Sequence, residues 1–222
     1  MTDIQTRRFS SKAGFDAALV QKLELAIATP DAAIMLAGGR TPLAAYNELA
    51  QRQPRPAQGL HLLYSDDRYV PSTSDSSNYY QSRALVNALA LPEAAVLRVR
   101  TELPLEQAAT DYEQKLTALW RDGHEIALGL LGLGADGHTA SLFNAGHLVE
   151  ARGRLAIPVQ RPDGMQGVSV TPDVLARVRE LIFLVTGADK HAVIEAFLRS
   201  DSDLTARKAV AGCPRVGLWT AS

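Results

Sequence analysis

The chain alternates short apolar segments with longer segments of helical periodicity. The short segments are rich in Ile, Leu and Val and tend to end at Gly, Asp or Thr, whereas the longer ones repeat apolar residues every three or four positions. This alternation is typical of βαβ units, whose helices cover a parallel sheet. We therefore expect an α/β protein with a single-domain, Rossmann-like, three-layer fold in which helices flank a mostly parallel sheet.

The same pattern gives approximate bounds for these elements. The segment 125–131 is apolar on both faces, as a central parallel strand must be. The proline-containing loop 51–59 is too short for a domain linker, so residues 1–222 are predicted to form one domain. Strands are predicted at residues 32–37, 60–64, 96–99, 125–131, 155–159, 167–171, 181–186 and 216–219, and helices at 11–26, 42–49, 78–89 and 105–120 and from about residues 172 and 189.

Composition and charge narrow the classes of function. With 23 basic and 24 acidic residues the formal net charge is −1, so no overall field attracts nucleic acid or an anionic membrane, and an anionic ligand needs a local site. The one cysteine, Cys213, excludes an internal disulfide framework or a structural zinc site and fits a reducing cytoplasm. The first ten residues lack the apolar run of a secretory leader, and no apolar run reaches ~18 residues. A cytoplasmic protein is expected.

Three polar clusters follow predicted strands, at residues 38–41, 66–68 and 136–138. Open parallel sheets bind ligands outside the carboxyl ends of their strands. We therefore expect the three clusters to converge on one site.

The first cluster, in Gly-Gly-Arg-Thr-Pro at 38–42, leads from a strand into a helix. Backbone N–H groups at Gly38 and Gly39 can hold a phosphate, assisted by the charge of Arg40 and the hydroxyl of Thr41. A simple turn is the alternative. Lys190, which follows the strand predicted at 181–186, can reach the same edge as a point charge for phosphate or can face water.

His138 is the candidate catalytic base. An imidazole, whose ordinary pKa is about 6.5, can take a proton from water near neutral pH, and a neighbouring carboxylate stabilises the imidazolium that forms. Asp136 and Asp66 are both candidates for that carboxylate. Thr139 is expected to cap the helix that follows, and Ser141 lacks the G-x-S-x-G surroundings of a nucleophile.

The segment 132–137 also permits two other interpretations. It matches the dinucleotide fingerprint G-x-G-x-x-G, but Asp136 would place a carboxylate where a pyrophosphate should lie. Glycines that only permit a tight turn are the second alternative. A tight turn would explain why glycines occur in this part of the backbone, but it would not explain why Asp136 and His138 flank the last glycine.

These residues resemble the 6-phosphogluconolactonases, a branch of a larger group that includes the glucosamine-6-phosphate deaminases. The resemblance spans nearly the whole chain. The deaminases share Asp-Gly-His but continue with Ile-Ala-Phe-Asn-Glu, so Thr-Ala-Ser-Leu-Phe at 139–143 favours the lactonase branch. The motifs occur in the order of the family: Ala-Gly-Gly-Arg-Thr-Pro at 37–42, Asp-Asp-Arg-Tyr-Val-Pro at 66–71 followed by Ser77 and Asn78, Leu-Gly-Leu-Gly-Ala-Asp-Gly-His-Thr-Ala-Ser-Leu-Phe at 131–143, and Thr-Gly-Ala-Asp-Lys at 186–190.

The resemblance implies a carboxylic ester hydrolase that converts 6-phosphoglucono-1,5-lactone to 6-phosphogluconate, the second step of the oxidative pentose phosphate pathway, without a metal or organic cofactor. It implies that His138 is the base for the attacking water and that Asp136 orients it. Arg68 and Lys190 would stabilise anionic groups of the substrate, and the loop 38–41 would hold its phosphate.

The expected partner is thus a phosphorylated sugar lactone, with no nucleic acid or membrane, and the expected state is a monomer or weak homo-oligomer. A deaminase or isomerase acting on sugar phosphates, a nicotinamide-dependent oxidoreductase and a non-catalytic sugar-phosphate sensor are the alternatives.

Three positions depart from the family's pattern. Ala37 replaces the serine of Ser-Gly-Gly, and Asp67 replaces the glutamate of Asp-Glu-Arg. Gln166 and Gly167 stand where relatives carry an arginine before Val-Thr-Leu-Thr or a similar run. Our hypothesis is that Arg40 replaces this arginine in the phosphate site.

Overall fold

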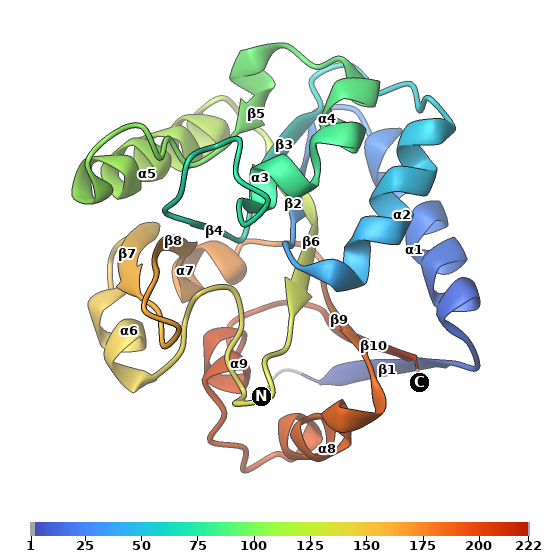
Figure 1. Cartoon of the computed structure of the whole chain (residues 1–222), viewed down its shortest axis with the longest axis vertical. Helices are drawn as coiled ribbons and strands as arrows, with labels where there is room; N and C mark the ends of the chain where they lie inside the picture. Colours follow the sequence, from blue (N-terminus) through green and yellow to red (C-terminus); the bar gives the residue numbers. More distant parts are fainter. Residues whose placement is uncertain (1–2, 222) are drawn as a thin grey trace.

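A seven-stranded parallel sheet forms the centre of the structure (Figure 1). The computed structural model describes residues 3–221. Its strands lie in the order β1-β10-β9-β6-β2-β3-β5, so the apolar strand β6 is central, and the expected α/β fold with a mostly parallel sheet is confirmed. The strands are β1 (Ile4–Phe9), β2 (Ala32–Leu36), β3 (His61–Tyr64), β5 (Val96–Leu97), β6 (Glu125–Gly132), β9 (Leu181–Thr186) and β10 (Val216–Ala221).

Helices cover both faces of this sheet, because successive side chains of its buried strands point to opposite faces. In β2, Ile34 and Leu36 pack with α1, α2 and α4, whereas Ala33 and Met35 pack in the core formed with α5, α7, α8 and α9. No helix within residues 3–221 is long and apolar enough to cross a membrane. The helices are α1 (Lys12–Ile27), α2 (Arg40–Gln51), α3 (Asn78–Gln81), α4 (Arg83–Leu89), α5 (Leu105–Arg121), α6 (Ala145–Glu150), α7 (Pro172–Leu175), α8 (His191–Leu198) and α9 (Thr205–Ala209), with short 3₁₀ turns at Glu93–Ala95 and Ala188–Lys190.

A second, antiparallel sheet has the strand order β4-β8-β7. Its strands are β4 (Asp66–Arg68), β8 (Gln166–Val170) and β7 (Ala156–Gln160). The sequence predicts β7 and β8 but places residues 66–68 in a loop and suggests no separate sheet. A β-turn at residues 161–164 joins β7 to β8, and this tight connection makes the two strands antiparallel.

Other elements also differ from the sequence-based expectation. Four of the six residues of β1 are exposed, so this edge strand carries no apolar alternation that would predict it. The helix expected at 78–89 is interrupted at Ser82, whose hydroxyl donates to the carbonyl oxygen of Tyr79 at 3.0 Å. The helix α2 begins at Arg40, so Pro42 lies in its first turn as expected.

Ser11 caps α1, since its Oγ accepts a hydrogen bond from the N–H of Gly14 at 3.1 Å. A Ser11→Ala substitution should lower the free energy of unfolding by about 1 kcal/mol, because it removes the partner of an otherwise unpaired N–H group. Urea denaturation measures this loss. Ser10→Ala, at the exposed neighbouring position, is the control, and equal losses in the two variants would contradict the capping role.

Candidate active site

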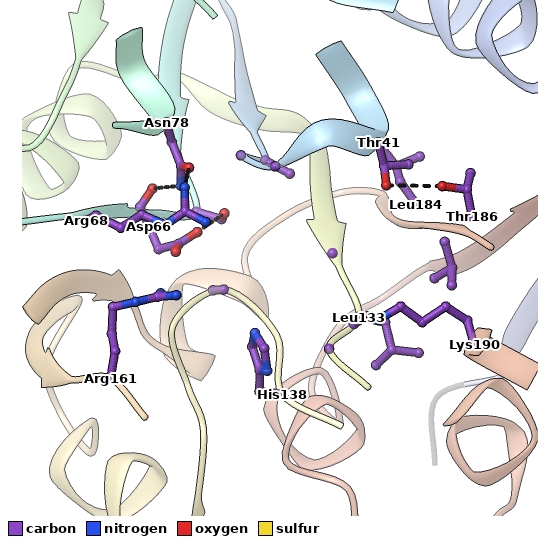
Figure 2. A pocket seen from close by; sticks show the side chains of 18 residues that line it. Thr41, Asp66, Arg68, Asn78, Leu133, His138, Arg161, Leu184, Thr186 and Lys190 are labelled. Atoms are coloured by element: carbon purple, nitrogen blue, oxygen red, sulfur yellow. Dashed lines mark hydrogen bonds between the residues drawn. The ribbon is translucent and has the colours of Figure 1, made fainter. Parts of the chain in front are cut away.

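Loops that follow four neighbouring strands, β9, β6, β2 and β3, line one pocket at the carboxyl end of the parallel sheet. Figure 2 shows their side chains around a common space. The structure therefore brings the three polar clusters of the sequence together. The segment after β9 also lines the pocket. The lining residues include Gly38, Gly39 and Thr41 after β2, Asp66 and Arg68 after β3, Gly134 and His138 after β6, and Thr186 and Lys190 at and after the end of β9.

His138 and Asp136 form a hydrogen-bonded pair in the loop after β6. Oδ1 of Asp136 lies 2.5 Å from Nδ1 of His138 and also accepts the backbone N–H of His138 at 3.2 Å. Partial burial raises the pKa of Asp136, but the hydrogen bonds from His138 outweigh it, and the pKa lies below its ordinary value. An ionised carboxylate only accepts hydrogen bonds, so Nδ1 carries a proton and Nε2 is left as the basic nitrogen.

The glycines of this loop make the pair possible. A Cβ on Gly134 would lie 2.1 Å from Nδ1 of His138 and 2.4 Å from Oδ1 of Asp136. Gly137 has a φ of +83°, which favours glycine, and its N–H donates to the carbonyl oxygen of Gly134 at 3.0 Å. The loop thus folds back so that the carboxylate and the imidazole meet two residues apart.

Thr139 does not cap a helix, which corrects the sequence-based expectation. Its Oγ1 donates to the carbonyl oxygen of Gly132 at 2.8 Å and ties the loop to the end of β6. Residues 139–144 are not helical; α6 begins at Ala145, where the side chain of Asn144 accepts the N–H of His147. The hydroxyl is fully buried and is occupied by this structural bond.

Asp66, the other candidate partner of His138, lies against serine hydroxyls instead. Its Oδ1 accepts from Oγ of Ser65 at 2.8 Å and its Oδ2 from Oγ of Ser141 at 2.7 Å. Ser141 is fully buried and, with its proton directed to Asp66, accepts a hydrogen bond from Nη1 of Arg161 at 2.9 Å. Of the two carboxylates, only Asp136 contacts the imidazole of His138 within the described residues.

Asp67 fixes the start of α3 through its two oxygens. They accept the N–H of Asn78 at 2.6 Å, the hydroxyl of Ser77 at 3.0 Å and the N–H of Tyr79 at 3.3 Å. Burial raises the pKa of Asp67 to about 6, and these hydrogen bonds oppose the rise. Asn78 in turn accepts from Nη1 of Arg68 at 2.8 Å and so holds this guanidinium at the pocket wall. The sequence identifies Asn78 only as a residue that follows the motif at 66–71, and does not predict its contact with Arg68.

The loop 38–41 enters α2 beside the pocket. A Cβ on Gly38 would lie 1.8 Å from Oδ1 of Asn78, so only glycine fits there. Gly39 has a φ of +87°, and its N–H donates to Oε1 of Gln81 at 3.1 Å. Thr41 faces Thr186, with 3.3 Å between their hydroxyl oxygens (Figure 2).

Arg161, in addition to Arg68, brings a guanidinium to this pocket, and Arg40 does not. Arg40 is exposed and does not line the pocket, whereas Arg161 does. Our hypothesis that Arg40 replaces the missing arginine therefore lacks structural support. Lys190 supplies a further cation, and its Nζ donates to the carbonyl oxygen of Leu133 at 3.3 Å.

Comparison with known proteins places the chain in a family. The sequence model of the family described as glucosamine-6-phosphate isomerases/6-phosphogluconolactonase matches residues 11–215. The 6-phosphogluconolactonase of Synechocystis sp. is 39% identical over 171 residues, which are 74% of this chain and 70% of that protein. For the 6-phosphogluconolactonase of Thermotoga maritima the identity is 40% over 112 residues, 50% of this chain and 49% of that protein.

Solved structures share the fold over the full length. The crystal structure of 6-phosphogluconolactonase from Thermotoga maritima has a TM-score of 0.85 and 26% identity, and the match covers 99% of this chain and 100% of that one. The family match covers every residue that lines the pocket and all strands of the two sheets except β1 and β10. The chain belongs to the glucosamine-6-phosphate isomerase/6-phosphogluconolactonase family.

Proposed function

We propose that the protein hydrolyses 6-phosphoglucono-1,5-lactone to 6-phosphogluconate, the second step of the oxidative pentose phosphate pathway. The observation that carries this proposal is the hydrogen-bonded pair of Asp136 and His138 in a pocket that also contains Arg68, Arg161 and Lys190. A base beside several cations suits the hydrolysis of an anionic ester. The relatives named above support the same reaction.

In the proposed mechanism, Nε2 of His138 removes a proton from a water molecule as its oxygen attacks the lactone carbonyl carbon. The carbonyl oxygen becomes an oxyanion, and Asp136 stabilises the imidazolium by the hydrogen bond at Nδ1. When the tetrahedral intermediate collapses, the bond from this carbon to the ring oxygen breaks. The imidazolium returns its proton to the ring oxygen, so one residue serves both steps and the product is the open-chain acid.

The phosphate of the substrate is proposed to lie at the start of α2, near Lys190. The first turn of a helix exposes backbone N–H groups that favour an anion. Thr41 lines the pocket there and offers a hydroxyl. The N–H of Gly39, which now donates to Gln81, becomes available to the phosphate if that side chain turns away.

An assay of freshly generated 6-phosphogluconolactone, corrected for its spontaneous hydrolysis, tests the proposal. Purified protein should accelerate loss of the lactone. Release of ammonia from glucosamine 6-phosphate would identify a deaminase instead. Binding of 6-phosphogluconate without any acceleration of hydrolysis would identify a sensor and contradict the proposal.

The ionised Asp136 should matter for turnover. We expect Asp136→Asn to lower kcat by about 10- to 150-fold, the equivalent of about 1.5–3 kcal/mol for a lost charge-assisted hydrogen bond. The amide keeps the shape of the side chain but does not stabilise the imidazolium. Asp163→Asn is the matched control. Asp163 pairs with Arg161 and not with His138, so this variant should leave kcat at the wild-type value and change only KM. An Asp136→Asn enzyme with the kcat of the wild type would contradict the assigned role.

The proposal extends to the state of the protein: a single domain of residues 1–222 that acts in the cytoplasm as a monomer or weak homo-oligomer. The two core clusters share strands β2, β6 and β9, which supports one folding unit. Burial of the Cys213 thiol supports a protein that needs no disulfide. Sedimentation equilibrium measures the oligomeric state.

A further inference from the structure

The imidazole of His138 contacts the aromatic ring of Phe143. The two ring centres lie 4.4 Å apart, with an angle of 43° between the ring planes. Phe143 is half-buried and is not among the residues that line the pocket, whereas His138 is. In Figure 2, His138 lies between Arg161 and Lys190. The ring of Phe143 therefore meets the catalytic imidazole without occupying the space that a substrate would fill.

The imidazole needs such a contact because its other contacts do not fix its rotation. Oδ1 of Asp136 lies 2.5 Å from Nδ1, and the backbone of Gly134 lies so close that a Cβ there would be 2.3 Å from Cε1. The χ2 torsion of a histidine has a broad energy minimum, so one hydrogen bond leaves the ring able to rock about it. Rocking would cost the imidazole its van der Waals contact with Phe143. The aromatic ring thereby restricts the direction of Nε2.

Phe143 is itself held by two helices. Its N–H donates to Nδ1 of His147 in α6 at 3.1 Å, and its carbonyl oxygen accepts the hydroxyl of Thr205 in α9 at 3.4 Å. Its ring also meets the ring of His147 edge to face, with 6.0 Å between the ring centres. Contacts with α6 and α9 thus keep the aromatic ring in place beside the catalytic loop.

The same aromatic ring contacts Arg161, whose guanidinium carbon lies 5.1 Å from the ring centre. A ring at this distance attracts a cation. Arg161 has other support, however, since it donates to Asp163 at 2.9 Å and to Oγ of Ser141 at 2.9 Å. Within residues 3–221, the imidazole of His138 has Asp136 as its one hydrogen-bond partner. The imidazole therefore depends on the aromatic ring more than the guanidinium does.

We propose that Phe143 is a positioning residue for the reaction, whose ring holds the imidazole of His138 so that Nε2 faces the attacking water. This inference rests on the proposed function, in which Nε2 removes the proton of that water. The transfer needs the base within hydrogen-bond reach, and a displacement of about 1 Å can cost about 10²-fold in rate. Loss of the aromatic ring should therefore slow the chemical step and leave binding of the lactone unchanged.

Steady-state kinetics of Phe143→Leu and Phe143→Tyr with 6-phosphogluconolactone test the proposal. Phe143→Leu keeps an apolar side chain but removes the ring, so kcat should fall by about 10- to 100-fold while KM changes by less than about twofold. Phe143→Tyr keeps the ring and should retain kcat within about threefold of the wild type. If thermal unfolding shows that Phe143→Leu does not fold, Phe143→Met carries the same test, since its flexible side chain fills the space without a ring.

Phe9→Leu is the matched control. Phe9 is also half-buried, and its ring likewise contacts an arginine and a second aromatic ring: the guanidinium carbon of Arg7 lies 4.6 Å from its centre and the ring of Trp219 lies 5.4 Å away. It ends the edge strand β1 and does not line the pocket. Its kcat and KM should equal those of the wild type.

Three kinetic results would overturn the proposal: a folded Phe143→Leu enzyme with the kcat of the wild type, equal losses of kcat in the two leucine variants, or a rise of KM alone. The last result would assign the aromatic ring to Arg161 instead of His138.

Failure of the proposed function is a different result, in which the wild type does not accelerate hydrolysis of the lactone. The proton NMR spectrum then decides the inference. The Nδ1 proton of His138, held by Asp136, should give a low-field resonance, assigned by its absence in His138→Asn. This resonance should persist in Phe9→Leu and broaden or disappear in Phe143→Leu. An unchanged resonance in Phe143→Leu would refute the positioning role.

Discussion

Replacing His138 with asparagine should lower kcat for 6-phosphogluconolactone by about 10²- to 10⁴-fold, the usual contribution of a positioned general base. Asparagine can still donate a hydrogen bond to Asp136, so the loop after β6 keeps its anchor. It has no nitrogen that takes a proton from water near neutral pH. Stopped assays that follow lactone loss, with the spontaneous rate subtracted, measure the effect.

His124→Asn is the control for this substitution. His124 precedes β6, at the opposite end of that strand from the pocket, and its Nδ1 lies 3.1 Å from the carbonyl oxygen of Asp31. Its kcat should match that of the wild type. A folded His138→Asn enzyme with full lactonase activity would show that another group activates the water.

The position of the site follows from the sequence because parallel strands place their carboxyl ends at one edge. The apolar strand β6 is central, as its two apolar faces predict, and it delivers His138 between the loops after β2 and β9. The assumption of a parallel sheet is therefore enough to predict that polar clusters nearly 100 residues apart in the sequence meet at one site. The pairing of Asp136 with His138 is local, since the two residues share one turn.

Other parts of the site depend on long-range geometry that periodicity does not encode. Asp66 and Asp136 both follow strands, and only the fold of their loops decides which one reaches His138. Arg161 reaches the pocket because β8 pairs with β4 and β7 in one particular register. A three-residue strand such as β4 carries too few residues to show alternation, so the sequence did not predict this sheet.

The glycines at the end of β6 and in the loop after it are the clearest case in which the structure separates residues that look alike in sequence. The dinucleotide fingerprint would give them a shared role around a pyrophosphate. In the structure the three glycines have different surroundings. A Cβ on Gly132 would meet open space, a Cβ on Gly134 would overlap the side chains of His138 and Asp136, and Gly137 has a positive φ. Gly134 and Gly137 therefore make room for side chains of the protein itself, those of His138 and Asp136 and that of Leu204.

This difference gives the second large expected effect. Gly134→Ala should lower kcat by about 10²-fold, because the new methyl group must push Nδ1 of His138 and Oδ1 of Asp136 from their positions, and a displacement of about 1 Å costs that much. The atoms within 3 Å belong to side chains rather than backbone. The variant should consequently fold, with a far-ultraviolet circular dichroism spectrum like that of the wild type.

Gly132→Ala, two residues earlier in the same segment, separates this local effect from a general loss of loop flexibility. Its Cβ would have no protein atom within 4 Å, although Gly132 lines the pocket. The alanine should therefore leave His138 and Asp136 in place and keep kcat within about twofold of the wild type, as for substitutions without steric conflict, and contact of the new methyl group with bound lactone would change KM instead. Equal losses in the two alanine variants would mean that backbone freedom, rather than room for the imidazole and carboxylate, is what the glycines provide. A large loss at Gly134 alone would tie activity to the geometry of the pair.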